Sequence, residues 1–176
     1  MRTLVLGGIR SGKSAWAERR ITESDCATRY LATGATSGGD EDWARRVAAH
    51  RARRPAHWAT IETTDVAATL RADPATAALV DDIGGWLTAV MDGCDAWNGG
   101  SIERHVAELV DAVAEFDAPL VLVSPEVGLT VVPATEAGRR FADELGTLNQ
   151  RLAAVSDRVV LVVAGVAVPI KSERES

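Results

Sequence analysis

Residues 7–14 are the stretch of this chain whose residue types and spacing most clearly imply chemistry, and they read GGIRSGKS. They fit G-x-x-x-x-G-K-[ST], the pattern of a phosphate-binding loop. In such a loop, backbone N–H groups and the N-terminus of the following helix attract phosphate oxygens. Lys13 can reach the β- and γ-phosphates of a nucleotide, and Ser14 can place its hydroxyl on Mg²⁺. We therefore expect nucleotide binding at Gly7, Gly8, Ile9, Arg10, Ser11, Gly12, Lys13 and Ser14, with Lys13 also catalytic.

The elements that must position this loop follow from the pattern of apolar residues. Short apolar runs alternate with helical patterns along the chain, which is typical of an α/β fold. Strands are predicted at residues 3–6, 28–32, 58–61, 78–80, 120–123 and 159–163, and helices near residues 13–22, 41–53, 64–71, 86–92, 102–115 and 135–155. The sequence thus predicts one domain over residues 1–176, with a mostly parallel sheet flanked by helices.

Several polar residues lie at or just beyond the ends of predicted strands. They are Thr33, Glu62, Asp81 and Glu126. Ligands in parallel α/β sheets bind beyond the carboxyl ends of the strands, so each is a candidate for the site. Asp81 ends an apolar run, and proteins with a phosphate-binding loop hold Mg²⁺ with an acid at the end of such a buried strand. We therefore predict Ser14 and Asp81 as metal ligands. For Glu62, a solvated strand end is an equally good interpretation.

A second group of reactive residues lies in residues 40–58, DEDWARRVAAHRARRPAHW. His50 falls on one helical face with Trp43 and Val47, and five arginines crowd the same ten residues. Such arginines could receive a polyphosphate, and they would favour the neutral, nucleophilic imidazole of His50. The pattern alone favours a plainer interpretation, in which the helix is basic and solvated and His50 packs beside Trp43.

Composition limits the classes of function. The 176 residues carry a net charge of −6, which argues against non-specific nucleic-acid binding. No stretch approaches the roughly 20 apolar residues of a membrane span. Cys26 and Cys94 are far from a C-x-x-C spacing and read as reduced thiols. We expect a cytoplasmic protein.

Parts of the sequence also fit three other nucleotide-dependent functions. A regulatory GTPase fits D-x-x-G at residues 81–84, but the sequence contains no N-K-x-D segment to read guanine. A RecA-like ATPase acting on nucleic acid is disfavoured by the negative charge and the short length. A single-activity small-molecule kinase with an inert His50 stays open.

Together the motifs resemble a known family. They are GGIRSGKS at 7–14, YLAT at 30–33, DEDW and then RVxxHRxRRP within 40–55, WxTIE at 58–62, LVD at 79–81 with WLT at 86–88, EVGLTVVP at 126–133, and RxFxDELGxLNQxLA from Arg139. This ordered set, which spans nearly the whole chain, is similar to the bifunctional adenosylcobinamide kinase/adenosylcobinamide-phosphate guanylyltransferase family of cobalamin biosynthesis.

The resemblance implies a RecA-like P-loop fold, a homo-oligomer that is commonly a trimer, and two reactions. ATP or GTP phosphorylates adenosylcobinamide, and GTP then gives GMP to adenosylcobinamide phosphate through a guanylyl group on His50, which yields adenosylcobinamide-GDP. His50 is thus implied to be catalytic. Together with the strand-end positions, the resemblance also suggests nucleotide contacts at Thr33, Gly34, Arg51, Ala52, Arg53, Arg54, Glu62 and Asp81.

The chain departs from the family pattern at a few positions. Pro125 stands where the family usually has Asn, and Asp82 stands where Cys is common. Gly84 and Gly85 replace a polar or aliphatic pair. These differences bear on substrate contacts and loop geometry.

Overall fold

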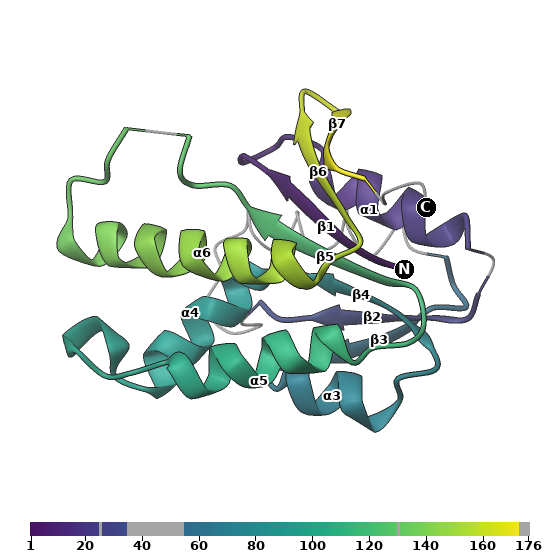
Figure 1. Cartoon of the computed structure of the whole chain (residues 1–176), viewed down its shortest axis with the longest axis horizontal. Coiled ribbons are helices and arrows are strands. Elements are labelled where there is room, and N and C mark those ends of the chain that lie inside the picture. Colours follow the sequence, from purple (N-terminus) through teal and green to yellow (C-terminus); the bar gives the residue numbers. More distant parts are fainter. Residues whose placement is uncertain (25, 35–54, 130, 173–176) are drawn as a thin grey trace.

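A computed structural model describes residues 1–24, 26–34, 55–129 and 131–172. Its centre is a seven-stranded sheet with the strand order β3-β2-β4-β5-β1-β6-β7 (Figure 1). The strands are β1 (Arg2–Gly7), β2 (Thr28–Ala32), β3 (Ala59–Glu62), β4 (Ala77–Asp81), β5 (Leu120–Pro125), β6 (Arg158–Val163) and β7 (Val166–Lys171). Neighbouring strands from β3 to β6 run parallel, and β7 returns antiparallel along β6.

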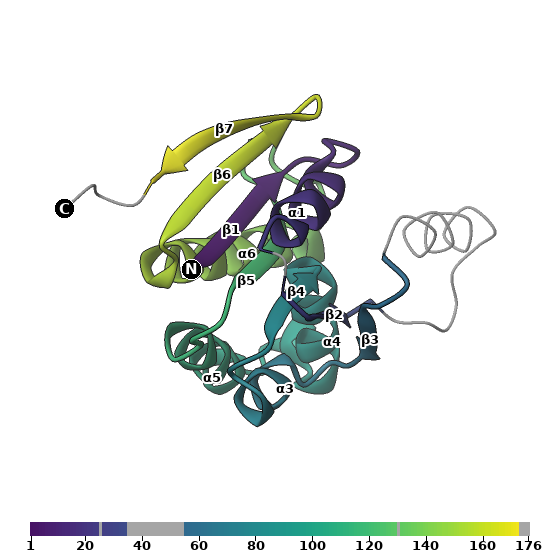
Figure 2. The same cartoon turned by 90° about the vertical axis from the view of Figure 1, so that its right-hand side faces the viewer.

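Helices cover both faces of the sheet. They are α1 (Lys13–Thr22), α3 (Val66–Ala72), α4 (Ile83–Gly93), α5 (Glu103–Ala114) and α6 (Glu136–Val155). Helix α1 packs on one face, and α3 to α6 pack on the other (Figure 2). Successive strand residues face opposite layers, so Leu4 belongs to the core under α3 to α6 and Val5 to the core under α1. Burial on both faces explains why the central strands β1, β4 and β5 are nearly continuous apolar runs.

The predicted elements agree with this structure within three residues, wherever the structure describes them. The predicted α/β fold with a mostly parallel sheet is confirmed. Helix α4 begins at Ile83, earlier than predicted, because the Asp82 side chain accepts a hydrogen bond from Gly85 N at 2.6 Å and caps the helix. The helix predicted at residues 41–53 lies outside the described residues.

Two elements of the structure were not predicted. One is a short 3-10 helix, Ala96–Asn98. The other is β7, which follows β6 after a two-residue turn and contains Pro169. The pairing of β6 with β7 is irregular between Val159 and Val160, where the register shifts. A prediction of six strands was therefore incomplete.

Candidate nucleotide site

The carboxyl ends of the parallel strands bring the predicted loop and strand-end residues to one edge of the sheet. The loop of residues 7–14 joins β1 to α1, Thr33 follows β2, Glu62 ends β3, and Asp81 ends β4. Backbone contacts tie neighbouring ends together: Thr33 N donates to Asp81 O at 3.4 Å, and Glu126 N donates to Gly7 O at 3.1 Å. The topology thus places a phosphate-binding loop beside a strand-terminal acid.

The shape of the loop depends on its glycines. A Cβ at Gly7 would lie 2.4 Å from Ser11 Oγ and 2.8 Å from the carbonyl oxygen of Val162, so no larger residue fits there. Gly12 has a φ of 93°, in the left-handed region that favours glycine. Between them, Ser11 N donates to Gly8 O at 3.2 Å and closes the turn. Successive backbone N–H groups in a turn of this kind can bind an anion.

The first turn of α1 is open to an anion. Helices α3, α4 and α6 begin with side-chain caps from Asp65, Asp82 and Thr135. Helices α1 and α5 begin without such a cap; the first turn of α5 carries Glu103, whereas that of α1 carries no acidic residue. The N–H groups at a helix start need a partner, and phosphate oxygens suit both their geometry and the helix dipole.

Lys13 lies over this loop. Its Nζ donates to Gly8 O at 3.4 Å. Gly8, Ile9 and Arg10 at the tip of the loop are exposed, so a ligand can reach it from solvent. The ammonium group is therefore close to the place where the phosphates of a bound nucleotide would lie.

Asp81 presents its two carboxylate oxygens to different neighbours. Ser14 Oγ donates to Oδ1 at 3.3 Å, and the Tyr30 hydroxyl donates to Oδ2 at 2.7 Å. Adjacent ligands of an octahedral Mg²⁺ at about 2.0–2.1 Å are about 2.9 Å apart, so Ser14 and Asp81 fit one ion or its bound water. Among the described residues no group of three His, Cys, Asp or Glu side chains could hold a metal.

Asp82 has a different environment from Asp81. Burial raises the pKa of the Asp82 carboxyl; the Gly85 N–H that it accepts lowers the pKa, and repulsion from Asp81 raises it. Thr33 Oγ1 donates to the backbone carbonyl of Asp82. Asp82 therefore acts as the cap of α4 and as part of the link between β2 and β4.

Two departures from the family pattern meet in space. A Cβ at Gly84 would lie 2.8 Å from the Pro125 ring. The missing side chain at Gly84 therefore leaves the room that the ring of Pro125 occupies. Sequence reasoning treated the two positions separately, because they are 41 residues apart.

The other predicted site residues differ in their exposure to solvent, and some lie outside the described residues. Thr33 is buried at 1% exposure, while Gly34 and Glu62 are exposed. His50, Arg51, Ala52, Arg53 and Arg54 lie outside the described residues. The structure therefore brings together residues 7–14, Thr33 and Asp81.

Sequence reasoning missed two supports of the site. One is the hydrogen bond from Tyr30, a residue that enters the sequence prediction only as part of the YLAT motif. The other is the turn between β6 and β7: Gly165 N donates to Ser11 O at 2.8 Å, and its Cα lies 3.1 Å from a Cβ built at Gly12. A tyrosine two residues before the end of a predicted strand, on the same strand face as the residue at that end, was a usable signal for the first. The second depends on β7, which was not predicted.

Comparison with known proteins decides the family. The sequence pattern of the cobinamide kinase / cobinamide phosphate guanyltransferase family matches residues 3–170. The chain belongs to this family. It is 46% identical over 176 residues to the bifunctional adenosylcobalamin biosynthesis protein CobP of Pseudomonas aeruginosa, covering 98% of this chain and 99% of that one. It is 36% identical over 184 residues to CobU of Salmonella typhimurium, covering 97% and 100%. The predicted family and the predicted enzyme class, a bifunctional kinase and guanylyltransferase, are confirmed.

Solved structures agree on the fold. An ATPase of a bacterial type III secretion system matches with a TM-score of 0.59 at 12% identity, over 91% of this chain and 51% of that chain. The RadB recombinase matches with a TM-score of 0.50 at 15% identity, over 91% and 73%. At these identities the likeness concerns the fold alone, and it confirms the predicted RecA-like P-loop architecture. Among the described helices, none combines the length and apolar character that crossing a bilayer requires.

Proposed function

We propose that the chain is a single catalytic domain, residues 1–176, that phosphorylates adenosylcobinamide and then attaches GMP to the product. The observation that carries this proposal is the complete phosphate-binding loop beside Asp81, in a chain of this family. In the first step, the loop and the start of α1 hold the triphosphate of ATP or GTP. The substrate hydroxyl oxygen bonds to the γ-phosphorus, the bond to the β-phosphate oxygen breaks, and the hydroxyl proton leaves to solvent or a base.

The residues of the loop stabilise charge in this step. Lys13 neutralises the oxygens between the β- and γ-phosphates as negative charge builds on the leaving group. Ser14 and Asp81 would hold Mg²⁺, which supplies further charge neutralisation when it is bound. Thr33, Gly34 and Glu62, at the same sheet edge, are proposed nucleotide contacts. Arg51, Ala52, Arg53 and Arg54 are proposed as further contacts.

In the second step, we propose that a neutral His50 nitrogen attacks the α-phosphorus of GTP. A P–N bond forms, the bond between the α- and β-phosphates breaks, and pyrophosphate leaves. The phosphate of adenosylcobinamide phosphate then attacks the same phosphorus, so the P–N bond breaks and adenosylcobinamide-GDP is released. The covalent intermediate divides one difficult transfer into two easier ones.

The test separates the two reactions. Wild type, His50→Ala, Lys13→Ala and His57→Ala are incubated with α-labelled GTP and Mg²⁺, and the label is mapped by peptide mass spectrometry. We expect the label on His50 of the wild type as a phosphoramidate, labile in acid and durable in alkali. His50→Ala should lose the label and GMP transfer but keep most kinase turnover, because its phosphate-binding loop is intact. Lys13→Ala should lose γ-phosphoryl transfer to adenosylcobinamide.

His57→Ala is the matched control, because His57 is an exposed histidine close in sequence to His50. It should label like the wild type. Label on a residue other than His50, or equal labelling of His50→Ala, would refute the covalent role and favour a single-activity kinase. Near-normal kinase turnover in Lys13→Ala would remove the kinase step from this loop.

We extend the proposal to assembly and location. A homo-oligomer, a trimer by family resemblance, is supported by exposed apolar side chains on the β6–β7 hairpin and on the loop after β5. The cytoplasm is the proposed compartment, because the free thiols of Cys26 and Cys94 stay reduced there.

A further inference from the structure

Tyr30 is a buried polar residue that the reaction scheme above does not use. It is 2% exposed, it lies on β2, and it packs in the core under α1. In the register of β2 and β4 it is opposite Leu79, and Ala32 is opposite Asp81. Residues two apart on a strand share a face, so Tyr30 and Asp81 lie on the face of the sheet that carries α1.

The hydroxyl of Tyr30 reaches the acid at the end of the neighbouring strand. It donates to Asp81 Oδ2 at 2.7 Å, while Ser14 Oγ donates to Oδ1 at 3.3 Å. A hydrogen bond from a neutral donor to an ionised carboxylate is stronger than one between neutral groups. The bond to Oδ2 therefore leaves Oδ1 directed toward the phosphate-binding loop.

The orientation of an aspartate carboxylate needs such a contact. The terminal torsion of Asp is broad, so packing alone does not fix which oxygen faces a ligand. The Tyr30 ring is held by the core around it, so its hydroxyl is a rigid donor. A second contact steadies the same strand end, because Thr33 N donates to the backbone carbonyl of Asp81 at 3.4 Å.

We propose that Tyr30 is a positioning residue, which orients the Asp81 carboxylate so that Oδ1 and the Ser14 hydroxyl can hold a divalent cation with the nucleotide. This inference rests on the proposed function, because it assumes that Asp81 serves the metal. It assigns to Tyr30 no contact with the nucleotide and no part in proton transfer. Partners that orient metal-binding carboxylates typically contribute about 10- to 100-fold to metal affinity.

The test compares Tyr30→Phe, which keeps the ring and removes the hydroxyl, with Asp81→Asn and Thr28→Val. Thr28 is the matched control: it is also buried on β2, and its hydroxyl donates to Cys26 O at 3.0 Å at the opposite end of the strand. Mn²⁺ binding is measured by electron paramagnetic resonance with a non-hydrolysable GTP analogue present. Binding of the analogue alone is measured in EDTA.

We expect Tyr30→Phe to weaken Mn²⁺ binding about 10-fold and to leave metal-free nucleotide binding unchanged. The Mg²⁺ concentration at half-maximal kinase activity should rise in the same proportion. Thr28→Val should match the wild type in both the Mn²⁺ binding and the Mg²⁺ requirement, although it too loses a partly buried hydrogen bond. If Asp81→Asn weakens Mn²⁺ binding and Tyr30→Phe does not, the positioning role is wrong and the metal site stands. If neither variant weakens Mn²⁺ binding, Asp81 does not hold the metal. The inference about Tyr30 and the proposed metal site are then both wrong. The proposed role of His50 is tested separately, by the GTP labelling.

A second measurement avoids substitution. Tyr30 is the single tyrosine of the chain, so protein grown with 3-fluorotyrosine carries one reporter in this contact. We expect its ¹⁹F resonance to shift when Mg²⁺ is added with the GTP analogue, and to shift much less in Asp81→Asn. If the ¹⁹F resonance of the wild type does not shift when Mg²⁺ is added with the analogue, the inference is wrong. This result would hold even if Tyr30→Phe did not fold.

Discussion

At the scale of single residues, short contacts decide what each side chain can do. The loop of residues 7–14 could be predicted because its function depends on neighbours in sequence. The roles of Asp82 and Pro125 could not, since each depends on a contact with another segment or on burial. Asp81 and Asp82 are adjacent in sequence, yet one faces Ser14 and the other caps α4. The apolar run pointed to Asp81 as the strand-end acid, but the capping role of Asp82 depends on where α4 begins, and the predicted start of that helix was three residues late.

Another acid, Asp157, is fixed by Arg2 from the other end of the chain. Arg2 Nη2 donates to Oδ1 at 2.7 Å, and Arg2 N donates to Oδ2 at 2.6 Å. The hydrogen bond from the Arg2 side chain holds the pKa of the Asp157 carboxyl below its usual range, and the same bond raises the pKa of Arg2. Ionised Asp157 thus stabilises the folded chain.

We predict that Asp157→Asn lowers the free energy of unfolding by about 1–2 kcal/mol at pH 7. The lowered pKa means that this stabilisation is full above the unfolded-state pKa of about 3.9 and is lost as the pH falls through the folded-state pKa. The free energies of unfolding of the wild type and the variant, measured with urea from pH 7 downward, should converge only in that acidic range. Asp111→Asn, at an exposed position on α5, serves as the control. A difference that stays constant into the acid range would mean that the charge is not the cause.

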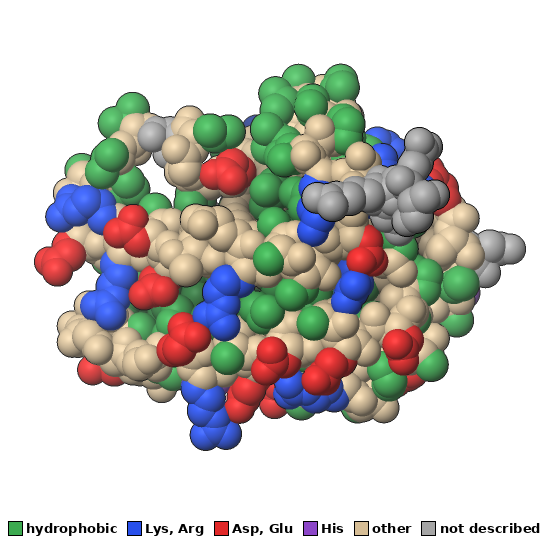
Figure 3. Space-filling model, viewed as in Figure 1, with side chains coloured by type: hydrophobic (Ala, Val, Ile, Leu, Met, Phe, Trp, Pro, Cys, Tyr) green, Lys and Arg blue, Asp and Glu red, His purple; other side chains and the backbone are tan. Residues whose placement is uncertain are grey.

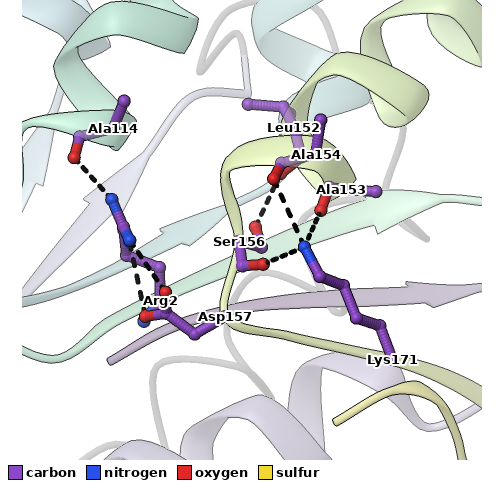
Figure 4. A network of polar contacts seen from close by, with 8 residues as sticks. All are labelled: Arg2, Ala114, Leu152, Ala153, Ala154, Ser156, Asp157 and Lys171. Carbon is purple, nitrogen blue, oxygen red and sulfur yellow. Dashed lines mark hydrogen bonds and ion pairs between the residues drawn. The ribbon is translucent and has the colours of Figure 1, made fainter. Parts of the chain in front are cut away.

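At the scale of elements, β7 secures the end of α6. Lys171 Nζ donates to the carbonyls of Ala153, Ala154 and Ser156 at 2.9, 3.3 and 2.6 Å (Figure 4). A cation at a helix C-terminus satisfies free carbonyls and opposes the negative end of the helix dipole. Val159 is opposite Lys171 and Val160 is opposite Pro169, so the register shift between them turns Lys171 to the α6 side of the sheet.

We predict that Lys171→Met lowers the free energy of unfolding by about 1 kcal/mol, because the aliphatic stem remains and the ammonium group is lost. Amide hydrogens of β7 should exchange faster in the variant. The control is Gln150→Met, at an exposed position on α6. Equal stability of wild type and Lys171→Met would show that the contacts in Figure 4 do not hold the hairpin to the helix.

The elements themselves were largely predictable, because buried parallel strands and amphipathic helices leave strong periodic signals. The periodic signal of strand β7 is weak. Its residues VAVPIK are mostly exposed, so no core imposes a pattern on them, and Pro169 argues against a strand interior. Its place depends on Lys171 and on the turn at Gly165, two contacts that are visible only in three dimensions.

At the scale of the whole molecule, exposed apolar side chains gather near the site. Figure 3 shows them over the β6–β7 hairpin and over the loop after β5. The members with exposures of 49–90% are Leu129, Val131, Val132, Val163, Val166, Val168 and Ile170. Large apolar patches on a soluble protein usually mark an interface.

We predict that sedimentation equilibrium gives three times the 18.6 kDa mass of one chain. Val166→Asp with Val168→Asp should shift the protein toward the monomer, because burying two carboxylates in an interface is costly. Thr60 is exposed on β3, the strand at the opposite edge of the sheet from β7, so Thr60→Asp should sediment like the wild type. A monomeric wild type would leave the apolar residues without this explanation.

The irregular pairing of β7 has a consequence for aggregation. The two outer strands of the described sheet are β3 and β7, and an outer strand with a free row of N–H and C=O groups can recruit strands of other molecules. Strand β3 has four residues, which is a short template. Strand β7 includes Pro169, which has no N–H to offer, and its shifted register interrupts the flat ladder that stacking requires. Both borders of the sheet therefore resist open-ended growth into fibrils, although the chain exposes valines along one of them.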